Sequence, residues 1–290
     1  MKEPLFLGVS TALVTPFIEG QVNYPLAEQL IRRQMDAGVR SIVLAGTTGE
    51  APTLSDAEKI ELFRRGKQYA GTDCQIIAGT GTNCTKRTVM LSIAAERAGA
   101  DALLVVAPYY NKGNPQGIYE HFEAVANAVS IPVIIYNVPS RTGVDIPASV
   151  YQRLSKIDNI AGVKEASCDI TKITDIRNCC GNHFPIWTGN DDQTVPVISL
   201  GGSGVISVIS NILPAETAAM ANAALAGDYK RASALQCQLK PLIDLLFSEV
   251  NPIPVKYAMH YIGFDCGGYR LPLTPPQNET KHNLDKYFGM

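Results

Sequence analysis

A lysine directly follows a short apolar run near the middle of the chain. Residues 160–163 are typical of a buried strand, and Lys164 and Glu165 come at its end. Burial lowers the pKa of a lysine, and the neutral amine attacks carbonyl carbons to form a Schiff base. With a pKa of about 10.4, roughly one lysine in 2,500 is neutral at pH 7, whereas a pKa of about 7–8 makes the nucleophile abundant. The same residues are equally compatible with a lysine that reaches solvent and pairs with Glu165.

Hydroxyl groups and an arginine follow two other apolar runs. Thr47 and Thr48 lie between glycines in the segment 46–50, where hydroxyls and backbone N–H groups together suit a carboxylate, although an ordinary turn has the same composition. Tyr136 ends the run 132–137, and Arg141 follows in the next loop. A tyrosine near a lysine can transfer protons, and an arginine can bind a carboxylate through two hydrogen bonds. Alone, Tyr136 would be interpreted as a core aromatic, but its place one strand before Lys164 favours the functional interpretation.

Strand-like and helix-like segments alternate through most of the chain and would position these residues. The helical segments are 24–37, one from 55, one ending at 97, 114–129, one from 148, 170–179 and 194–200. The eight apolar runs are 5–13, 41–45, 75–78, 101–107, 132–137, 160–163, 186–188 and 204–208. Such runs are typical of parallel strands buried on both faces. We therefore expect an α/β fold, a closed (β/α)8 TIM barrel over residues 1–224, in preference to a doubly wound sheet, since no GxGxxG motif follows the first run.

The alternation stops after about residue 225. Segments 228–249, 254–262 and 276–287 have helical patterns, and the first of them has leucines and alanines along one face. We expect residues 225–290 to form a small C-terminal helical extension that packs on the barrel.

Composition excludes several classes of protein. The formal net charge is −2 and the charges are well mixed, which disfavours nucleic acid as a partner. The start of the chain does not resemble a signal peptide, and no apolar run is long enough to cross a membrane. Seven cysteines without a CxxC pair indicate reduced thiols in a cytoplasmic protein. The four histidines lack metal-ligand spacing, so we expect no metal site.

Three motifs, in this order and spacing, resemble the dihydrodipicolinate synthase/N-acetylneuraminate lyase family. They are Gly46-Thr47-Thr48-Gly49-Glu50, the segment 136–143, and Gly162-Val163-Lys164-Glu165-Ala166. The resemblance covers essentially the whole chain, including segments 204–208 and 251–256. Within the family, the paired threonines and the segment 140–143 point to the branch that condenses pyruvate with L-aspartate 4-semialdehyde, giving 4-hydroxy-tetrahydrodipicolinate. That lyase reaction is the first committed step of the diaminopimelate route to lysine.

The resemblance implies a role for each candidate catalytic residue. Lys164 would form the Schiff base with pyruvate. Tyr136, Thr47 and Tyr110 would form a proton relay, with Tyr110 supplied by a neighbouring subunit. Such a shared site implies a homo-oligomer, in this family usually a homotetramer built as a dimer of dimers.

The resemblance also implies the groups that bind the substrates. Thr48 and the backbone at Ile206 would hold the pyruvate carboxylate, and Arg141 would bind the carboxylate of L-aspartate 4-semialdehyde. No metal or redox cofactor is required by this chemistry.

Two alternatives stay open. Another pyruvate-dependent class I aldolase, such as N-acetylneuraminate lyase or a 2-keto-3-deoxy-sugar lyase, would share Lys164 and Tyr136, and Arg141 is the discriminating residue. A catalytically silent barrel that only binds ligands is disfavoured by the retention of the four catalytic residues.

Feedback inhibition by L-lysine is expected to be weak or absent. Lysine-sensitive relatives bind this inhibitor at the subunit interface, near the helix that follows the second strand. Here that region carries Lys59 and Arg87, which would repel the inhibitor's ammonium groups, and Asp56 would offset only part of the repulsion.

Overall fold

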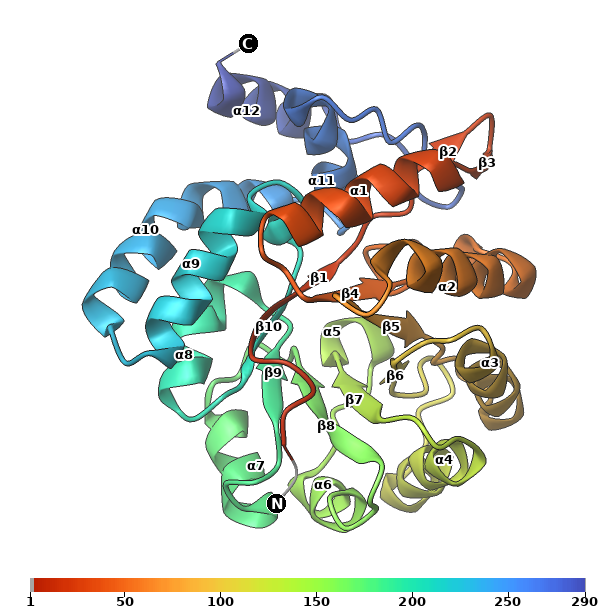
Figure 1. Cartoon of the computed structure of the whole chain (residues 1–290). Helices are drawn as coiled ribbons and strands as arrows, with labels where there is room; N and C mark the ends of the chain where they lie inside the picture. The colour runs from red at the N-terminus through yellow and green to blue at the C-terminus, as the bar shows by residue number, and fades with distance from the viewer. Residues whose placement is uncertain (1–2, 290) are drawn as a thin grey trace.

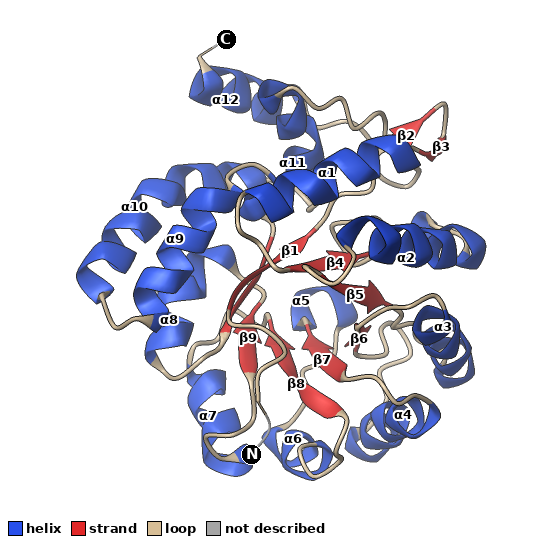
Figure 2. Cartoon of the chain, in the orientation of Figure 1, coloured by secondary structure: helices blue, strands red, loops and turns tan. Residues whose placement is uncertain are grey.

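Eight parallel strands close into a barrel in the computed structural model, which describes residues 3–289. Around the barrel the order of strands is β1, β10, β9, β8, β7, β6, β5 and β4. Each barrel strand therefore pairs with the barrel strand that precedes it in the chain, and the last, β10, pairs with the first, β1. Their bounds are β1 Gly8–Ala12, β4 Ser41–Leu44, β5 Gln75–Gly79, β6 Ala102–Val106, β7 Val133–Asn137, β8 Ile160–Glu165, β9 Ile186–Thr188 and β10 Gly204–Ser207. The TIM barrel predicted from the alternation is confirmed (Figure 2).

A ring of helices covers the outside of the barrel (Figure 1). These helices are α1 Tyr24–Asp36, α2 Asp56–Ala70, α3 Thr85–Arg97, α4 Pro115–Ala128, α6 Ala148–Leu154, α7 Thr171–Cys180, α8 Thr194–Ser199 and α9 Pro214–Leu225. Local sequence fixes some of their ends. Ser55 caps α2 through the backbone N–H of Glu58, whose carboxylate accepts from the backbone of Ser55 in return.

Four helices and strands differ from the sequence prediction. α9 was not predicted, because its alanine-rich sequence has little of the polar and apolar alternation that identifies a surface helix. A short antiparallel pair, β2 (Phe17–Ile18) and β3 (Gln21–Val22), lies in a segment to which the sequence analysis assigns no element, and a single helical turn, α5 (Pro139–Thr142), lies in a predicted loop. Elements this short leave no periodic signal in a sequence.

The side chains of the strands form two apolar layers. One lies between the barrel and the helices, and the other fills the barrel interior, where it includes Ile134, Tyr136, Trp187 and Ile206. Successive residues of a strand point to opposite faces, so the interior position of Tyr136 follows from that of Ile134. The barrel closes tightly at Gly204, where a side-chain carbon would lie 1.9 Å from the backbone oxygen of Gly8.

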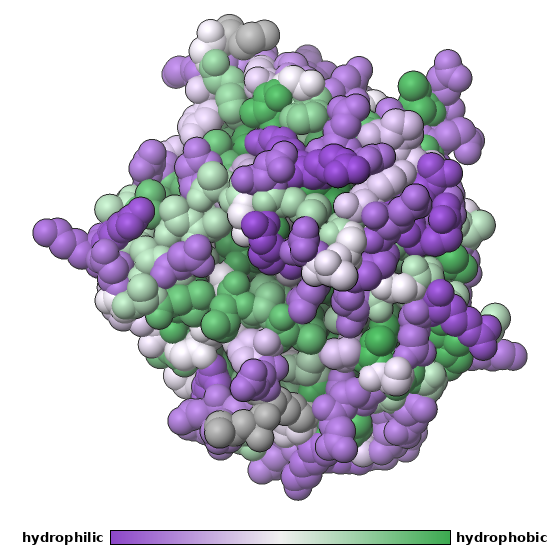
Figure 3. All heavy atoms as spheres, viewed as in Figure 1, coloured by the Kyte–Doolittle hydropathy of each residue, from purple (hydrophilic) through white to green (hydrophobic). Residues whose placement is uncertain are grey.

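The C-terminal segment adds three helices, as predicted. α10 (Tyr229–Leu246) lies along α8 and α9, and α11 (Ile253–Ala258) and α12 (Asn278–Phe288) contact α10 and one another. α12 lies at the top of Figure 1. In the same view, Figure 3 shows hydrophilic residues over α1 and α2 and a mixture of both kinds over the other helices. Within residues 3–289, every helix is too short or too polar to span a membrane.

Candidate active site

Lys164 lies inside the barrel, beside a tyrosine. It is on β8, its Cα pairs in register with that of Tyr136 on β7, and only 5% of its surface is exposed. The Lys164 ammonium lies 4.3 Å from the centroid of the Tyr136 ring. Gly189, just after β9, provides the space: a side-chain carbon there would come within 2.8 Å of Lys164 Cε. A larger residue at this position would displace the amine.

Glu165 faces away from Lys164, because adjacent residues of a strand point to opposite faces. Its carboxylate accepts hydrogen bonds from the side chain of Asn137 at 3.0 Å, from the backbone N–H of Ser167 at 2.8 Å and from the hydroxyl of Tyr151 at 3.3 Å. Burial raises the pKa of Glu165, and the bonds from Ser167 and Asn137 oppose that change. The alternative of a solvated Lys164–Glu165 pair is therefore not what the structure shows.

The turn after β4 holds both predicted threonines at the carboxyl end of the barrel strands, the end at which TIM-barrel enzymes place their active sites. Thr48 is buried, and its Oγ1 accepts a hydrogen bond of 3.0 Å from the side-chain amide of Asn251. The turn is fixed at Glu50, whose carboxylate accepts a 2.6 Å bond from Lys256, with both side chains fully buried. Asn251 and Lys256 belong to the C-terminal segment, which therefore shapes the site.

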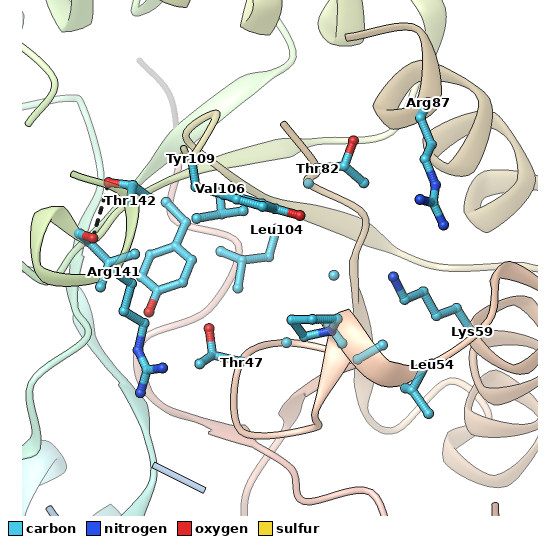
Figure 4. A pocket seen from close by; sticks show the side chains of 18 residues that line it. Thr47, Leu54, Lys59, Thr82, Arg87, Leu104, Val106, Tyr109, Arg141 and Thr142 are labelled. Carbon is cyan, nitrogen blue, oxygen red and sulfur yellow. Dashed lines mark hydrogen bonds between the residues drawn. The ribbon is translucent and has the colours of Figure 1, made fainter. Parts of the chain in front are cut away.

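A cavity of about 290 Å³ lies next to this turn. Thr47, Tyr136 and Arg141 are among the residues that line it, and Figure 4 shows Thr47 and Arg141 on one side of it. Arg141 is on α5, and its Nη2 donates a hydrogen bond of 2.9 Å to the backbone oxygen of Asn251. A guanidinium has five N–H donors, so Arg141 keeps donors for a carboxylate. Tyr136 connects the two parts of the site, since it lines the cavity and contacts Lys164.

Ile206 is fully buried on β10 among the interior side chains. The backbone just after this strand is held by Asp191, whose Oδ2 accepts from the N–H groups of Val208 at 2.8 Å and Ile209 at 3.1 Å. Asp191 is fully buried, which raises its pKa. This arrangement fixes the backbone beside Ile206.

Tyr110 is the one predicted site residue that does not lie with the others within a single chain. It is 89% exposed and its φ is +73°, on the loop after β6. Tyr109, and not Tyr110, lines the cavity. Within its own chain, Tyr110 therefore does not contribute to the cavity.

Sequence reasoning missed several residues that shape the site. Asn251 and Lys256 lie in a segment that was noted only for its resemblance, and Gly189 and Asp191 follow the weakly patterned strand β9. The unusual clustering of two prolines beside Asn251 was the one signal present. Among residues 3–289, no three His, Cys, Asp or Glu side chains are grouped so as to bind a metal.

Comparison with known proteins gives one consistent result. A family model described as the dihydrodipicolinate synthetase family matches residues 5–288. A curated protein of Thermoanaerobacter sp. (strain X514), named 4-hydroxy-tetrahydrodipicolinate synthase, is 45% identical over 98% of this chain and 97% of its own length. A curated protein of Lachnoclostridium phytofermentans with the same name is 46% identical over 93% of this chain and 92% of its own length.

Solved structures agree with the fold. The dihydrodipicolinate synthase of Aquifex aeolicus is 41% identical, with a TM-score of 0.96 over 98% of this chain and 97% of that one. Another similar structure is described as the first monomeric dihydrodipicolinate synthase variant. It is 37% identical, with a TM-score of 0.95 over 98% of this chain and 97% of that one.

Proposed function

The chain belongs to the dihydrodipicolinate synthetase family, and from this premise we propose roles for the side chains around Lys164. The predicted resemblance is confirmed, and so is the predicted reaction. The protein is a lyase that condenses pyruvate with L-aspartate 4-semialdehyde to 4-hydroxy-tetrahydrodipicolinate, in the biosynthesis of diaminopimelate and lysine. The names of the relatives favour this reaction over the sugar-acid lyases considered above.

Lys164 is the nucleophile in this proposal, and its burial beside Tyr136 is the observation that carries it. The neutral amine attacks the keto carbon of pyruvate, and loss of water leaves a Schiff base. Removal of a proton from the pyruvate methyl group gives an enamine, whose carbon adds to the aldehyde of the second substrate. The amino group of that substrate then displaces Lys164 and closes the ring, which returns the free lysine.

Thr48 and Arg141 hold the two carboxylates. Oγ1 of Thr48 accepts its hydrogen bond from Asn251, so the Thr48 hydroxyl proton is left to donate to the pyruvate carboxylate. The backbone at Ile206, fixed through Asp191, completes that site. Arg141 binds the carboxylate of L-aspartate 4-semialdehyde at the cavity mouth, in a charge-assisted pair.

Tyr136, Thr47 and Tyr110 act as the proton relay, with Tyr110 contributed by a second subunit. A tyrosine that is almost fully exposed beside a catalytic cavity is a typical interface residue. The protein therefore functions as a homo-oligomer, in its usual form a homotetramer that is a dimer of dimers. The description of one relative as the first monomeric variant supports this, because it implies that monomers are unusual.

We assign residues 1–224 to the catalytic barrel and 225–290 to its helical extension, because α9, which completes the ring of barrel helices, ends within one residue of this boundary. We place the enzyme in the cytoplasm, since all seven cysteines are unpaired.

Incubation of the enzyme with pyruvate and a panel of aldehydes tests this function. We expect rapid pyruvate consumption with L-aspartate 4-semialdehyde and little with N-acetylmannosamine or glyceraldehyde. The opposite preference would contradict the proposal and favour the sugar-acid lyases. Substitution of Arg141 by alanine should raise KM for the semialdehyde more than KM for pyruvate.

A further inference from the structure

The neighbouring strands β7 and β8 (Figure 2) are not paired regularly along their whole length. Val133 pairs with Ile160. The next residue of β7, Ile134, pairs with Gly162, so β8 contains one extra residue, Ala161, at this point. Gly162 suits the irregular position, because a side-chain carbon there would lie 2.3 Å from a neighbouring backbone oxygen. Such bulges bend a strand and change the direction of the side chains that follow.

The bulge decides the face of the barrel to which Lys164 belongs. Ile160 and Val163 both lie in the apolar layer between the barrel and the helices, although residues three apart in a regular strand point to opposite faces. A regular strand counted from Ile160 would place Lys164 in that outer layer and Glu165 inside the barrel. A slip of β8 by one residue would have the same effect. The inward direction of Lys164 therefore requires that β8 keep this register.

A hydrogen-bonded pair joins β7 and β8 one residue beyond Tyr136 and Lys164. The Cα of Asn137 pairs in register with that of Glu165, and Asn137 Nδ2 donates to both carboxylate oxygens at 3.0 Å. Asn137 is 0% exposed and Glu165 is 3% exposed. Since this pair and the pair of Tyr136 with Lys164 are consecutive positions of the same two strands, a bond in the outer pair fixes the register of the inner one.

Other groups hold the pair in place. Asn137 Nδ2 also donates to Asp145 at 2.8 Å, and Asn137 Oδ1 accepts from the backbone N–H of Ile146 at 3.2 Å. Glu165 accepts from the two further donors described above. Two apolar side chains would fill the same space with less cost of desolvation, but they would not oppose a slip of one residue. The polar pair therefore provides a fixed register, which packing alone does not.

We propose that Asn137 and Glu165 are positioning residues, whose bond holds β8 in the register that directs Lys164 into the barrel beside Tyr136. This inference rests on the proposed role of Lys164 as the nucleophile. Neither Asn137 nor Glu165 is among the residues that line the cavity, so both act through the backbone of the two strands.

The rate at which pyruvate forms an adduct on Lys164 tests this role. Quenched-flow mixing with saturating pyruvate, with borohydride in the quench, measures that rate independently of weaker substrate binding. We expect Glu165→Ala to be slower by about ten- to a hundredfold, since a misplacement of about 1 Å can cost that much. Glu165→Gln should recover most of the rate, because its amide oxygen can still accept from Asn137 and the backbone of Ser167.

Ser92→Ala is the matched control. It removes a buried hydrogen bond of 2.9 Å with Thr80 on the outer side of the barrel and leaves β7 and β8 unchanged. Its melting temperature should fall, as that of Glu165→Ala should, but its rate of adduct formation should equal that of the wild type. A loss of stability alone would therefore not reproduce the effect expected for Glu165→Ala.

Three results would overturn the proposal. The first is a wild-type rate in folded Glu165→Ala, and the second is a rate in Glu165→Gln as low as in Glu165→Ala. If Glu165→Ala does not fold, Asn137→Ala decides, because Glu165 then keeps its other donors, and a wild-type rate in Asn137→Ala would contradict the role. The third is the absence of an adduct on Lys164 in the wild type, which would refute the nucleophile itself and the positioning role with it.

Discussion

The side-chain amide of Asn251 donates a hydrogen bond of 3.0 Å to Oγ1 of Thr48, although 203 residues separate the two in the chain. The backbone oxygen of Asn251 also accepts a 2.9 Å bond from Arg141. One residue of the C-terminal extension therefore contacts both side chains proposed to bind substrate carboxylates. The extension therefore belongs to the proposed active site and is not only a cover for the barrel.

Substitution of Asn251 by alanine should impair the binding of pyruvate more than folding. Loss of a buried hydrogen bond costs about 1–3 kcal/mol, which corresponds to a fall of roughly 5- to 150-fold in kcat/KM for pyruvate. Steady-state kinetics with each substrate varied in turn measure the effect. Asn278→Ala, at an exposed position of α12, is the control, and equal kinetics for the two variants would contradict the role of Asn251.

Replacement of Tyr110 by phenylalanine should lower kcat sharply and leave pyruvate binding nearly intact. Only the hydroxyl is lost, so the relay is interrupted while the substrate-binding groups remain. General acid–base groups typically contribute a factor of about 10²–10⁴ to the rate. Tyr287→Phe, at another partly exposed tyrosine, serves as the control, and unchanged turnover of Tyr110→Phe would rule out the relay.

The bond between Glu58 and Arg270 should make stability depend on acid pH. Hydrogen bonds from Arg270 lower the pKa of Glu58 from its ordinary 4.5 to about 2. Since the folded-state pKa is the lower one, the pair stabilises the fold above about pH 4.5, and this contribution is lost as pH falls toward 2. The melting temperature of Glu58→Gln should therefore lie below that of the wild type at pH 7. This difference in melting temperature should be smaller at pH 3.

The comparison variant for this experiment is Asp244→Asn, which removes an exposed ion pair with Lys240. Exposed pairs contribute little, so this variant should melt close to the wild type at both pH values. If the difference in melting temperature between Glu58→Gln and the wild type were the same at pH 7 and pH 3, the result would be inconsistent with the lowered pKa of Glu58.

L-lysine should inhibit weakly or not at all. The cavity end with Lys59 and Arg87 repels the two ammonium groups of such a ligand, and Asp56 is already bonded to Arg87. A rate assay with millimolar L-lysine measures this, and half-inhibition below about 1 mM, an affinity of roughly 4 kcal/mol, would show the prediction to be wrong. Arg87→Glu reverses one charge and should increase sensitivity to lysine.

The sequence predicted those parts of the fold that depend on local pattern. The eight apolar strands and the capping of α2 by Ser55 and Glu58 are local signals, and both are found in the structure. The alanine-rich α9 was missed because its composition is nearly uniform along the helix.

The parts of the site that the sequence did not predict were missed for a different physical reason. The contact of Asn251 with Thr48 and the pair of Lys256 with Glu50 join segments about 200 residues apart, so no local pattern signals them. The burial of Lys59 on an otherwise ordinary surface helix likewise depends on how α2 and α3 pack. The role proposed for Tyr110 depends on a second chain, which no property of one chain can place.

Borohydride reduction of the enzyme in the presence of pyruvate, followed by mass mapping of the modified peptides, tests the role of Lys164 most directly. We predict a stable pyruvate adduct on Lys164, loss of activity in proportion to labelling, and no adduct in Lys164→Ala. An adduct on another buried lysine, such as Lys59 or Lys256, or undiminished condensation by Lys164→Ala, would contradict the mechanism.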